Sequence, residues 1–376
     1  MEKRDPILES DQIKKGLRLI VFLLITLVAV TSIFIVRDLD ISVEKKFFSR
    51  ETGWFLDQKQ PWKFLHQYGT IPGVLLTLGA LAGLIFCMAK SRYRSYRKYF
   101  LLLVLTAVIG AGFTVNIVMK PYWGRPRPRQ TTEFGGQWAY RHPHQIGTPG
   151  KGQSFPCGHC TMGFLFVTLF FFHERSRLLS TAGGSFGLVY GFLIGAGRMV
   201  QGAHFATDVL WSLGVILLVA IILHYFALPR FGALVNAPDM TGRKKWLLGI
   251  GSAVLAALIL LGFLTRRPFY ETDFKTLDLK PGIKGLIVES NVDFEKEQVK
   301  FVEATSGKIL IHAKGFGWID ISQRVTIKSR TEGNVFRIIN HVQPMGYFSE
   351  LNHRIDLFLP DFLDKKIKIE FVKSSE

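Results

Sequence analysis

The chain has 376 residues, of which 48% are hydrophobic and 32 are phenylalanine, and its formal net charge is +18. Long apolar runs recur over the first 265 residues, each about long enough to cross a ~30 Å hydrocarbon core. Basic residues stand beside these runs, where they contact anionic phospholipid headgroups and set topology. This placement argues against nucleic acid as the partner of the positive charge. Three cysteines are too few for a disulfide framework.

Seven candidate membrane spans follow one another along the chain. They cover residues 17–36, 69–89, 99–119, 157–173, 180–197, 207–228 and 246–264. Basic clusters follow the second, fourth and sixth spans, which is consistent with an amino terminus in the cytoplasm. The first run is long for a signal peptide and lacks a small-residue cleavage site, so we expect a retained helix. A short interfacial helix is expected around Val43–Phe48.

The loop between the third and fourth spans is basic although it lies on the outward face in this topology. It is rich in Gly, Pro and His, which makes it too polar to cross a membrane. We therefore expect an anionic group to bind there, near Lys120, Arg125, Arg127, Arg129, Arg141 and Lys151. The glycines of the fifth span predict close approach of neighbouring helices.

The sequence changes character from about Pro268. Apolar and polar residues alternate in GLIVES, QVKFVEA, KILIHA, RVTIKSR and KIKIEFV, which is the period of half-buried strands. We predict an all-α polytopic membrane bundle over residues 1–265 and an all-β, sandwich-like extracytoplasmic domain over residues 266–376. The second domain has no catalytic or metal-binding cluster of residues in its sequence. The sequence does not indicate which partner it binds.

Three polar clusters stand at span ends that this topology brings to one surface. They are KPYWGRPRP at 120–128, SFPCGH at 154–159 and RMVQGAHFATD at 198–208. His204 and Asp208 are four residues apart and share one helix face. The carboxylate can accept a proton from one ring nitrogen and leave the other as a nucleophile. An isolated pair of this kind is more often a structural hydrogen bond.

The remaining residues of these clusters suit a phosphoryl group. Lys120, Arg127 and Arg198 can stabilise its oxygens, although basic residues at a membrane edge usually anchor headgroups. Gly158 lets the backbone approach a phosphate at a helix start, and His159 beside it can serve as acid and base. Arg125 and Arg129 are evenly balanced between headgroup binding and a solvated loop.

Together, K-x6-R-P, P-x-G-H and R-x5-H-x3-D resemble the three signature motifs of the type 2 phosphatidic acid phosphatase (PAP2) superfamily. The resemblance covers roughly residues 65–228 and implies a six-helix core and a phosphatase without metal or other cofactor. It implies that His204 forms a phosphohistidine, that Asp208 orients it and that His159 is the acid/base. The phosphate is then held by Lys120, Arg127, Arg198 and the Gly158 amide.

Two positions depart from the family pattern. Cys157 stands where the family usually has serine, and Gly197 where it often has serine. A thiol is a weaker hydrogen-bond donor than a hydroxyl, so the phosphate contact of Cys157 is expected to be weakened.

The substrate is expected to be a lipid of the bacterial inner membrane, reached from the periplasmic face. The runs SFPCGHCTMGF and GRMVQGAHFATDVLWS look most like the lipid A 1-phosphatase branch. Undecaprenyl diphosphate, phosphatidylglycerol phosphate and phosphatidic acid are alternatives, as is phosphate transfer from one lipid to another.

Cys157 and Cys160 also form the C-x-x-C pattern of thiol–disulfide oxidoreductases. A helix start lowers a thiol pKa, but that redox motif normally follows a strand in a βαβ unit. Zinc binding with His142 and His144 lacks the usual spacing. A disulfide that tunes phosphatase activity and a non-catalytic lipid-binding scaffold are the further alternatives.

Overall fold

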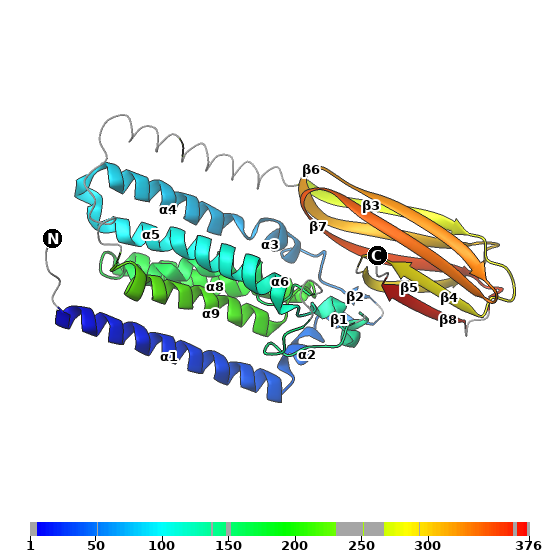
Figure 1. Cartoon of the computed structure of the whole chain (residues 1–376), viewed down its shortest axis with the longest axis horizontal. Coiled ribbons are helices and arrows are strands. Elements are labelled where there is room, and N and C mark those ends of the chain that lie inside the picture. The colour runs from blue at the N-terminus through cyan, green and yellow to red at the C-terminus, as the bar shows by residue number, and fades with distance from the viewer. Residues whose placement is uncertain are drawn as a thin grey trace. The chain divides into compact units, whose positions relative to one another are not determined.

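The computed structural model describes residues 6–50, 52–136, 138–147, 152–230, 251, 267–292, 294–363 and 367–373. The chain folds as two compact units, Met1–Leu260 and Leu261–Glu376. The sequence placed this boundary after residue 265. The first unit is helical and the second is a β-sheet, so the predicted fold class is confirmed (Figure 1).

Among the described residues, five helical segments are long and apolar enough to cross a membrane. They are Ser10–Val36, Trp62–Ala89, Arg92–Met119, Arg177–Val200 and Ala206–Ala227. A shorter apolar helix, Gly158–Phe172, stands at the fourth predicted span. The first six predicted spans are thus helical, and the seventh, 246–264, falls almost wholly outside the described residues.

Helices and short turns alternate along the first unit. The elements are α1 (Pro6–Val36), α2 (Leu39–Glu44), β1 (Phe48–Ser49), β2 (Gly53–Trp54), α3 (Trp62–Tyr68), α4 (Ile71–Ala89), η1 (Ser91–Tyr96), α5 (Arg97–Leu105), η2 (Thr106–Met119), α6 (Lys120–Trp123), η3 (Pro128–Gln130), η4 (Thr132–Phe134), α7 (Gly158–Phe164), η5 (Leu165–Phe172), α8 (Arg177–Val200), α9 (Ala206–Ile222) and η6 (Leu223–Ala227). Of these, η2 and η6 are π-helical.

The interfacial helix expected around Val43–Phe48 lies earlier in the chain, at α2. Two acidic residues of α2, Asp40 and Glu44, are almost completely buried. The predicted position is four residues too late, because so short a helix has no periodic pattern that fixes its ends.

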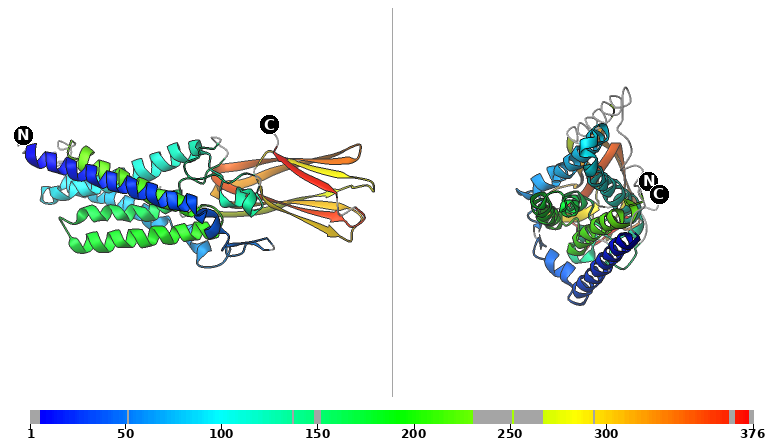
Figure 2. Two further views of the ribbon diagram at one scale, coloured as in Figure 1. Left: turned by 90° about the horizontal axis from the view of Figure 1, so that it is seen from below. Right: turned by 90° about the vertical axis from the view of Figure 1, so that its left-hand side faces the viewer.

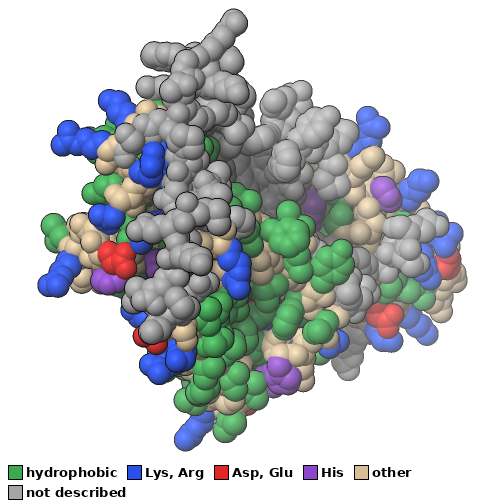
Figure 3. Space-filling model, turned by 60° about the vertical axis from the view of Figure 1, so that its left-hand side comes forward, with side chains coloured by type: hydrophobic (Ala, Val, Ile, Leu, Met, Phe, Trp, Pro, Cys, Tyr) green, Lys and Arg blue, Asp and Glu red, His purple; other side chains and the backbone are tan. Residues whose placement is uncertain are grey.

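The long helices form a bundle with α1 at its edge, as the end-on view shows (Figure 2). α1 leaves large apolar side chains exposed, with Phe22 70% and Ile25 63% accessible. Hydrophobic side chains gather over the flank of the bundle, with Lys and Arg side chains beside them (Figure 3). An apolar flank of this kind suits contact with lipid chains.

Glycines let α8 approach α7 and η5 closely, as the sequence predicted. A Cβ atom on Gly191 would lie 2.1 Å from the ring of Phe164. A Cβ atom on Gly187 would lie 2.6 Å from the backbone nitrogen of Val167. Any larger residue at either position would therefore push α8 away from the helix that carries the second motif.

The three motifs meet at one end of the bundle. Lys120 begins α6, Gly158 begins α7, and the third motif runs from the end of α8 to the start of α9. Figure 1 shows α2, α3 and α6 at this same end. The fold therefore brings together residues that are up to 88 positions apart, as 208 minus 120 gives.

The second unit is a six-stranded sheet. Its strands are β3 (Arg267–Leu277), β4 (Gly285–Ser290), β5 (Phe294–Val302), β6 (Gly307–Glu332), β7 (Val335–Pro360) and β8 (Lys368–Lys373). They follow the order β3-β6-β7-β4-β8, and β5 also pairs with β7. β6 pairs antiparallel with β3 and β7, whereas β4 pairs parallel with β7 and β8.

The predicted strand GLIVES coincides with β4, where burial alternates along the strand as expected. KILIHA and RVTIKSR were read as separate strands, but both belong to the continuous strand β6. Register shifts between β6 and β7 at Phe316 and Trp318 separate the two segments. Side chains of both ends of β7, including Ile338 and Leu357, share one buried core.

Candidate active site

The His204 imidazole lies buried between α8 and α9. Its Nδ1 atom lies 2.6 Å from the backbone carbonyl oxygen of Ser154. A carbonyl can only accept, so Nδ1 carries the proton and Nε2 carries the lone pair. Nε2 has no hydrogen-bond partner among the described residues. The ring is thus held in the tautomer that a nucleophile requires.

The surroundings of His204 keep its imidazole neutral. Burial holds the pKa of His204 well below its usual range, and the positive charges of Arg198, Lys120 and Arg127 lower it further. All three predicted phosphate-binding cations therefore lie within electrostatic range of the ring.

Asp208 does not accept the imidazole proton directly. Its Oδ2 atom lies 3.7 Å from His204 Nδ1, beyond hydrogen-bond distance. The carboxylate accepts instead from the Ser154 hydroxyl at 2.5 Å and from the Phe205 backbone amide at 2.8 Å. The predicted direct hydrogen bond is wrong, because the Ser154 carbonyl occupies the place expected for the carboxylate.

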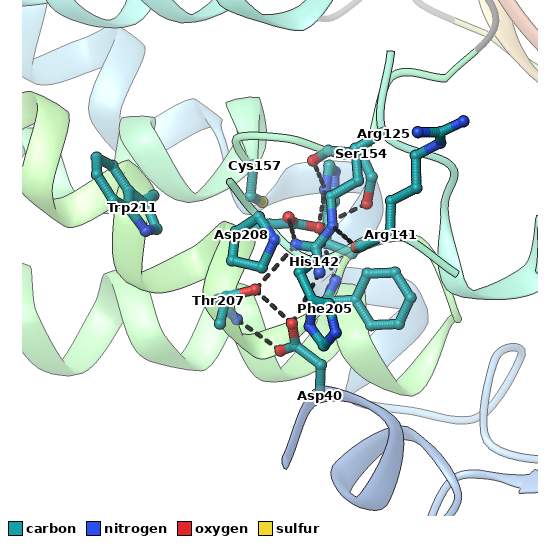
Figure 4. A network of polar contacts seen from close by, with 12 residues as sticks. Asp40, Arg125, Arg141, His142, Ser154, Cys157, Phe205, Thr207, Asp208 and Trp211 are labelled. Atoms are coloured by element: carbon teal, nitrogen blue, oxygen red, sulfur yellow. Dashed lines mark hydrogen bonds and ion pairs between the residues drawn. The ribbon is translucent and has the colours of Figure 1, made fainter. Parts of the chain in front are cut away.

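Ser154 joins all three motifs (Figure 4). Its amide donates to the carbonyl oxygen of Arg125 at 3.0 Å, its hydroxyl binds Asp208 and its carbonyl accepts from His204. Ser154 opens the second motif, but the motif pattern predicts no role for it. Two of its three contacts use backbone atoms, which every residue possesses, so its identity held little signal.

Gly158 and His159 open α7 as the second motif predicted. The Cys157 amide donates to the Asp208 carbonyl at 3.2 Å, and this ties α7 to α9. A Cβ atom on Gly158 would lie 2.5 Å from Oδ1 of Asn116, so the Asn116 side chain of η2 packs closely against the backbone there. The ring of His159 lies 5.6 Å from the ring of His66, measured between centroids.

Cys157 forms a disulfide with Cys160 across the first turn of α7. A disulfide sulfur has no proton, so the expected thiol contact with phosphate cannot form in this state. The same bond leaves no thiolate from these residues for the zinc alternative. Among the described residues, no group of three or more His, Cys, Asp or Glu side chains is arranged to hold a metal ion.

Arg125 is not available to a lipid headgroup. Its side chain is fully buried, with Nη2 2.8 Å from Asp40 and Nη1 2.5 Å from Asp208. The suggested headgroup contact is therefore wrong for Arg125, because two carboxylates already hold its guanidinium. Arg129 is also buried and donates to the Gly202 carbonyl at 3.3 Å, which connects the first motif to the third.

Residues 99–231 match the PAP2 superfamily. The "Lipid A 4′-phosphatase" of Francisella tularensis subsp. novicida (strain U112) is 29% identical over 184 residues, which cover 46% of this chain and 79% of the relative. The protein of the same name from Rhizobium leguminosarum is 35% identical over 106 residues, which cover 28% of this chain and 44% of the relative.

A solved structure also resembles this chain. It is the first transmembrane PAP2 type phosphatidylglycerolphosphate phosphatase from Bacillus subtilis, with a TM-score of 0.34 and 20% sequence identity. The alignment covers 58% of this chain and 98% of that chain.

The ordered motifs, the membrane helices and the sequence match define a PAP2-type domain. Residues 99–231 form a PAP2 superfamily domain, and the chain is a multi-pass membrane lipid phosphatase. The predicted family and enzyme class are confirmed.

Proposed function

We propose that the chain removes a phosphate from lipid A at the periplasmic face of the bacterial inner membrane, through a phosphohistidine on His204. The observation that carries the mechanism is the buried His204 ring, with its proton on Nδ1 and its lone pair on Nε2. The choice of lipid rests on the names of the Francisella and Rhizobium relatives.

The first half-reaction forms the phosphoenzyme. His204 Nε2 attacks phosphorus, the bond from phosphorus to the sugar oxygen breaks, and His159 gives that oxygen a proton. The imidazole then carries positive charge, which the Ser154 carbonyl and the nearby Asp208 carboxylate stabilise. The proton stays on Nδ1 of His204 throughout, where it is donated to the Ser154 carbonyl.

The second half-reaction releases inorganic phosphate. His159 takes a proton from water, the water oxygen attacks phosphorus, and the phosphorus–nitrogen bond breaks. The lone pair returns to Nε2 of His204. Lys120, Arg127 and Arg198 offset the charge on the equatorial oxygens in both halves.

The periplasmic orientation is supported by the basic clusters. Lys90, Arg92 and Arg94 end the second span, and Arg175 and Arg177 follow the fourth, at the end of the bundle away from the motifs. Basic residues favour the cytoplasmic side, so the motif end faces the periplasm.

The position of the phosphate on lipid A has two candidates. The motif runs favoured the 1-phosphate, whereas the relatives' names favour the 4′-phosphate. Lipid A that carries only the 4′-phosphate separates them. Release from this substrate supports the 4′ position, and release confined to the bisphosphorylated lipid supports the 1 position.

The test is phosphate release by the purified protein in detergent, with chelator present throughout. The panel contains lipid A, undecaprenyl diphosphate, phosphatidylglycerol phosphate and phosphatidic acid. His204→Ala is the inactive comparison, and His341→Ala, at an exposed position on β7, is the matched control. We expect lipid A to be the preferred substrate, with no release by His204→Ala and wild-type release by His341→Ala.

Other outcomes assign other functions. Preference for another lipid of the panel would reject lipid A as the substrate. Loss of lipid phosphate without inorganic phosphate would indicate transfer to an acceptor lipid. Release that persists in His204→Ala would reject the nucleophile.

A further inference from the structure

A carboxylate from outside the matched family region enters the active-site network. Asp40 belongs to α2 and is 1% exposed. Its Oδ2 atom accepts from Arg125 Nη2 at 2.8 Å, from the Thr207 hydroxyl at 2.5 Å and from the Tyr140 hydroxyl at 3.2 Å. Its Oδ1 atom accepts from the Thr207 backbone amide at 3.0 Å. Figure 4 shows the two contacts of Asp40 with Thr207.

One guanidinium connects Asp40 to Asp208. Arg125 donates from Nη2 to Asp40 and from Nη1 to Asp208, and both carboxylates are buried. A buried cation needs an opposite charge close by. With two carboxylates around it, Arg125 leaves a net negative charge in the cluster, and Asp208 is the member nearest His204.

Asp40 also holds the start of α9. The backbone amides of the first turn of a helix have no partners within the helix. Phe205 precedes α9 and has no side-chain acceptor of its own, whereas Asp40 accepts from the second helical residue, Thr207. The first turn of α9 carries Asp208 and begins two residues after His204, so a shift in this turn moves both.

We propose that Asp40 is a positioning residue for phosphoryl transfer. Through Arg125 and Thr207 it fixes Asp208 and the negative charge that stabilises His204 when the ring is phosphorylated. Asp40 itself touches neither the imidazole nor the substrate. The inference rests on the proposed role of His204 as nucleophile.

A purely architectural Asp40 and a positioning Asp40 predict different kinetics. An architectural role lowers the amount of folded enzyme but leaves the turnover of each folded molecule unchanged. A positioning role lowers kcat at nearly constant KM, because an interaction that is stronger in the transition state is lost.

The experiment compares Asp40→Asn with Asp38→Asn. Asparagine keeps the shape of Asp40 but removes its charge. Asp38 is exposed in the turn before α2 and has a left-handed backbone with φ of 47°, which asparagine tolerates. Both variants are purified as monodisperse protein, and kcat and KM are measured for the lipid that the wild-type enzyme hydrolyses fastest.

We expect kcat of Asp40→Asn to fall roughly 100-fold, the effect typical of a small misplacement of a reacting group. KM should stay within about twofold of the wild-type value, because the contacts that bind the substrate before the reaction are unchanged. Asp38→Asn should match the wild type. Wild-type kcat in folded Asp40→Asn, or a rise in KM alone, would overturn the proposal.

Tyr140→Phe tests the same cluster if Asp40→Asn does not fold. It removes one hydroxyl that donates to Asp40 and leaves both carboxylates in place. We expect kcat to fall about tenfold, in line with the loss of a hydrogen bond to a charged group. Unchanged kcat in this variant would then overturn the proposal.

Vanadate binding separates this inference from the function on which it rests. Vanadate can adopt five-coordinate geometry like that of phosphorus in the transition state, so binding should weaken in Asp40→Asn by a factor similar to the fall in kcat. His204→Ala serves as the blank. A wild-type protein that neither binds vanadate nor releases phosphate would overturn both proposals. Equal vanadate binding by wild type and Asp40→Asn would overturn only that for Asp40.

Discussion

The Nδ1 atom of His204 lies 2.6 Å from the carbonyl oxygen of Ser154. This contact fixes which ring nitrogen can attack phosphorus. Asp208 acts on His204 indirectly. Its carboxylate accepts from the Ser154 hydroxyl, and the Ser154 carbonyl accepts from His204. The hydroxyl and the carboxylate should therefore contribute unequally to catalysis.

Ser154→Ala should reduce kcat less than Asp208→Asn does. Alanine keeps the carbonyl that binds His204 and loses only the hydroxyl. The loss of this one hydrogen bond to a charged group should lower kcat roughly 10-fold. Asparagine at position 208 removes the negative charge that the Ser154 hydroxyl and Arg125 both contact. Steady-state rates of the two variants test this order, with Ser329→Ala at an exposed position on β6 as control. Wild-type activity in Ser154→Ala would contradict the link.

Gly158→Ala should inactivate the enzyme by crowding Asn116. The new Cβ would lie 2.5 Å from Asn116 Oδ1, so either the start of α7 or the Asn116 amide, which donates to the Ala111 carbonyl at 2.7 Å, must shift. Displacement of the start of α7 would cost about 100-fold in rate. Gly79→Ala is the matched control, since nothing lies within 4 Å of a Cβ there. Adding Asn116→Ala should restore part of the lost activity. Failure of this rescue would mean that the crowding is not the cause.

Glu44→Gln should stabilise the protein more at pH 8 than at pH 5. Burial, together with Asp40 and Asp208, raises the pKa of Glu44 well above its usual range, although Arg125 and Arg129 oppose this. The folded state therefore keeps a proton that the unfolded state loses as pH rises above about 4.5, at a cost of about 1.4 kcal/mol per pH unit until the folded pKa is reached. Glutamine removes this cost.

Thermal unfolding midpoints in detergent at the two pH values measure the effect of Glu44→Gln. Glu133→Gln is the control, because Glu133 is exposed in η4. An equal difference between Glu44→Gln and wild type at pH 5 and pH 8 would show that Glu44 titrates alike in the folded and unfolded states.

Reduction of the Cys157–Cys160 disulfide should lower activity. The bond crosses the turn that carries Gly158 and His159, so breaking it loosens both. Cys157→Ser/Cys160→Ser should lose the response to reductant, whereas Cys87→Ser should keep it because Cys87 is a free cysteine elsewhere in the bundle. Phosphate release with and without reductant measures the response. Equal rates for the wild-type enzyme under the two conditions would show that the disulfide does not regulate activity.

Much of the membrane unit followed from the sequence because its signals are local. Apolar runs of fixed length indicate spans, and motif spacing predicted His204, His159 and the three cations as site residues. Asp40 and Glu44 carried no such signal, since a six-residue helix after the first span has no motif around it. The partners of Asp40 lie far away in the sequence, Arg125 by 85 residues and Thr207 by 167.

The misassignments have a common physical cause. A basic residue in a polar loop normally faces water or lipid headgroups, so the burial of Arg125 between two carboxylates could not be read from its neighbours. The direct His204–Asp208 bond was inferred from helical spacing. However, His204 precedes the first residue of α9, Ala206, so the two residues do not share that helix.

The most direct test of the mechanism is to trap the phosphoenzyme. The enzyme is mixed with ³²P-labelled lipid substrate and quenched rapidly in alkali, in which a phosphorus–nitrogen bond on histidine survives, and the labelled peptide is identified by mass spectrometry. We predict label on His204 in the wild-type protein and none in His204→Ala. Label on another residue, or turnover that continues in His204→Ala, would contradict the account.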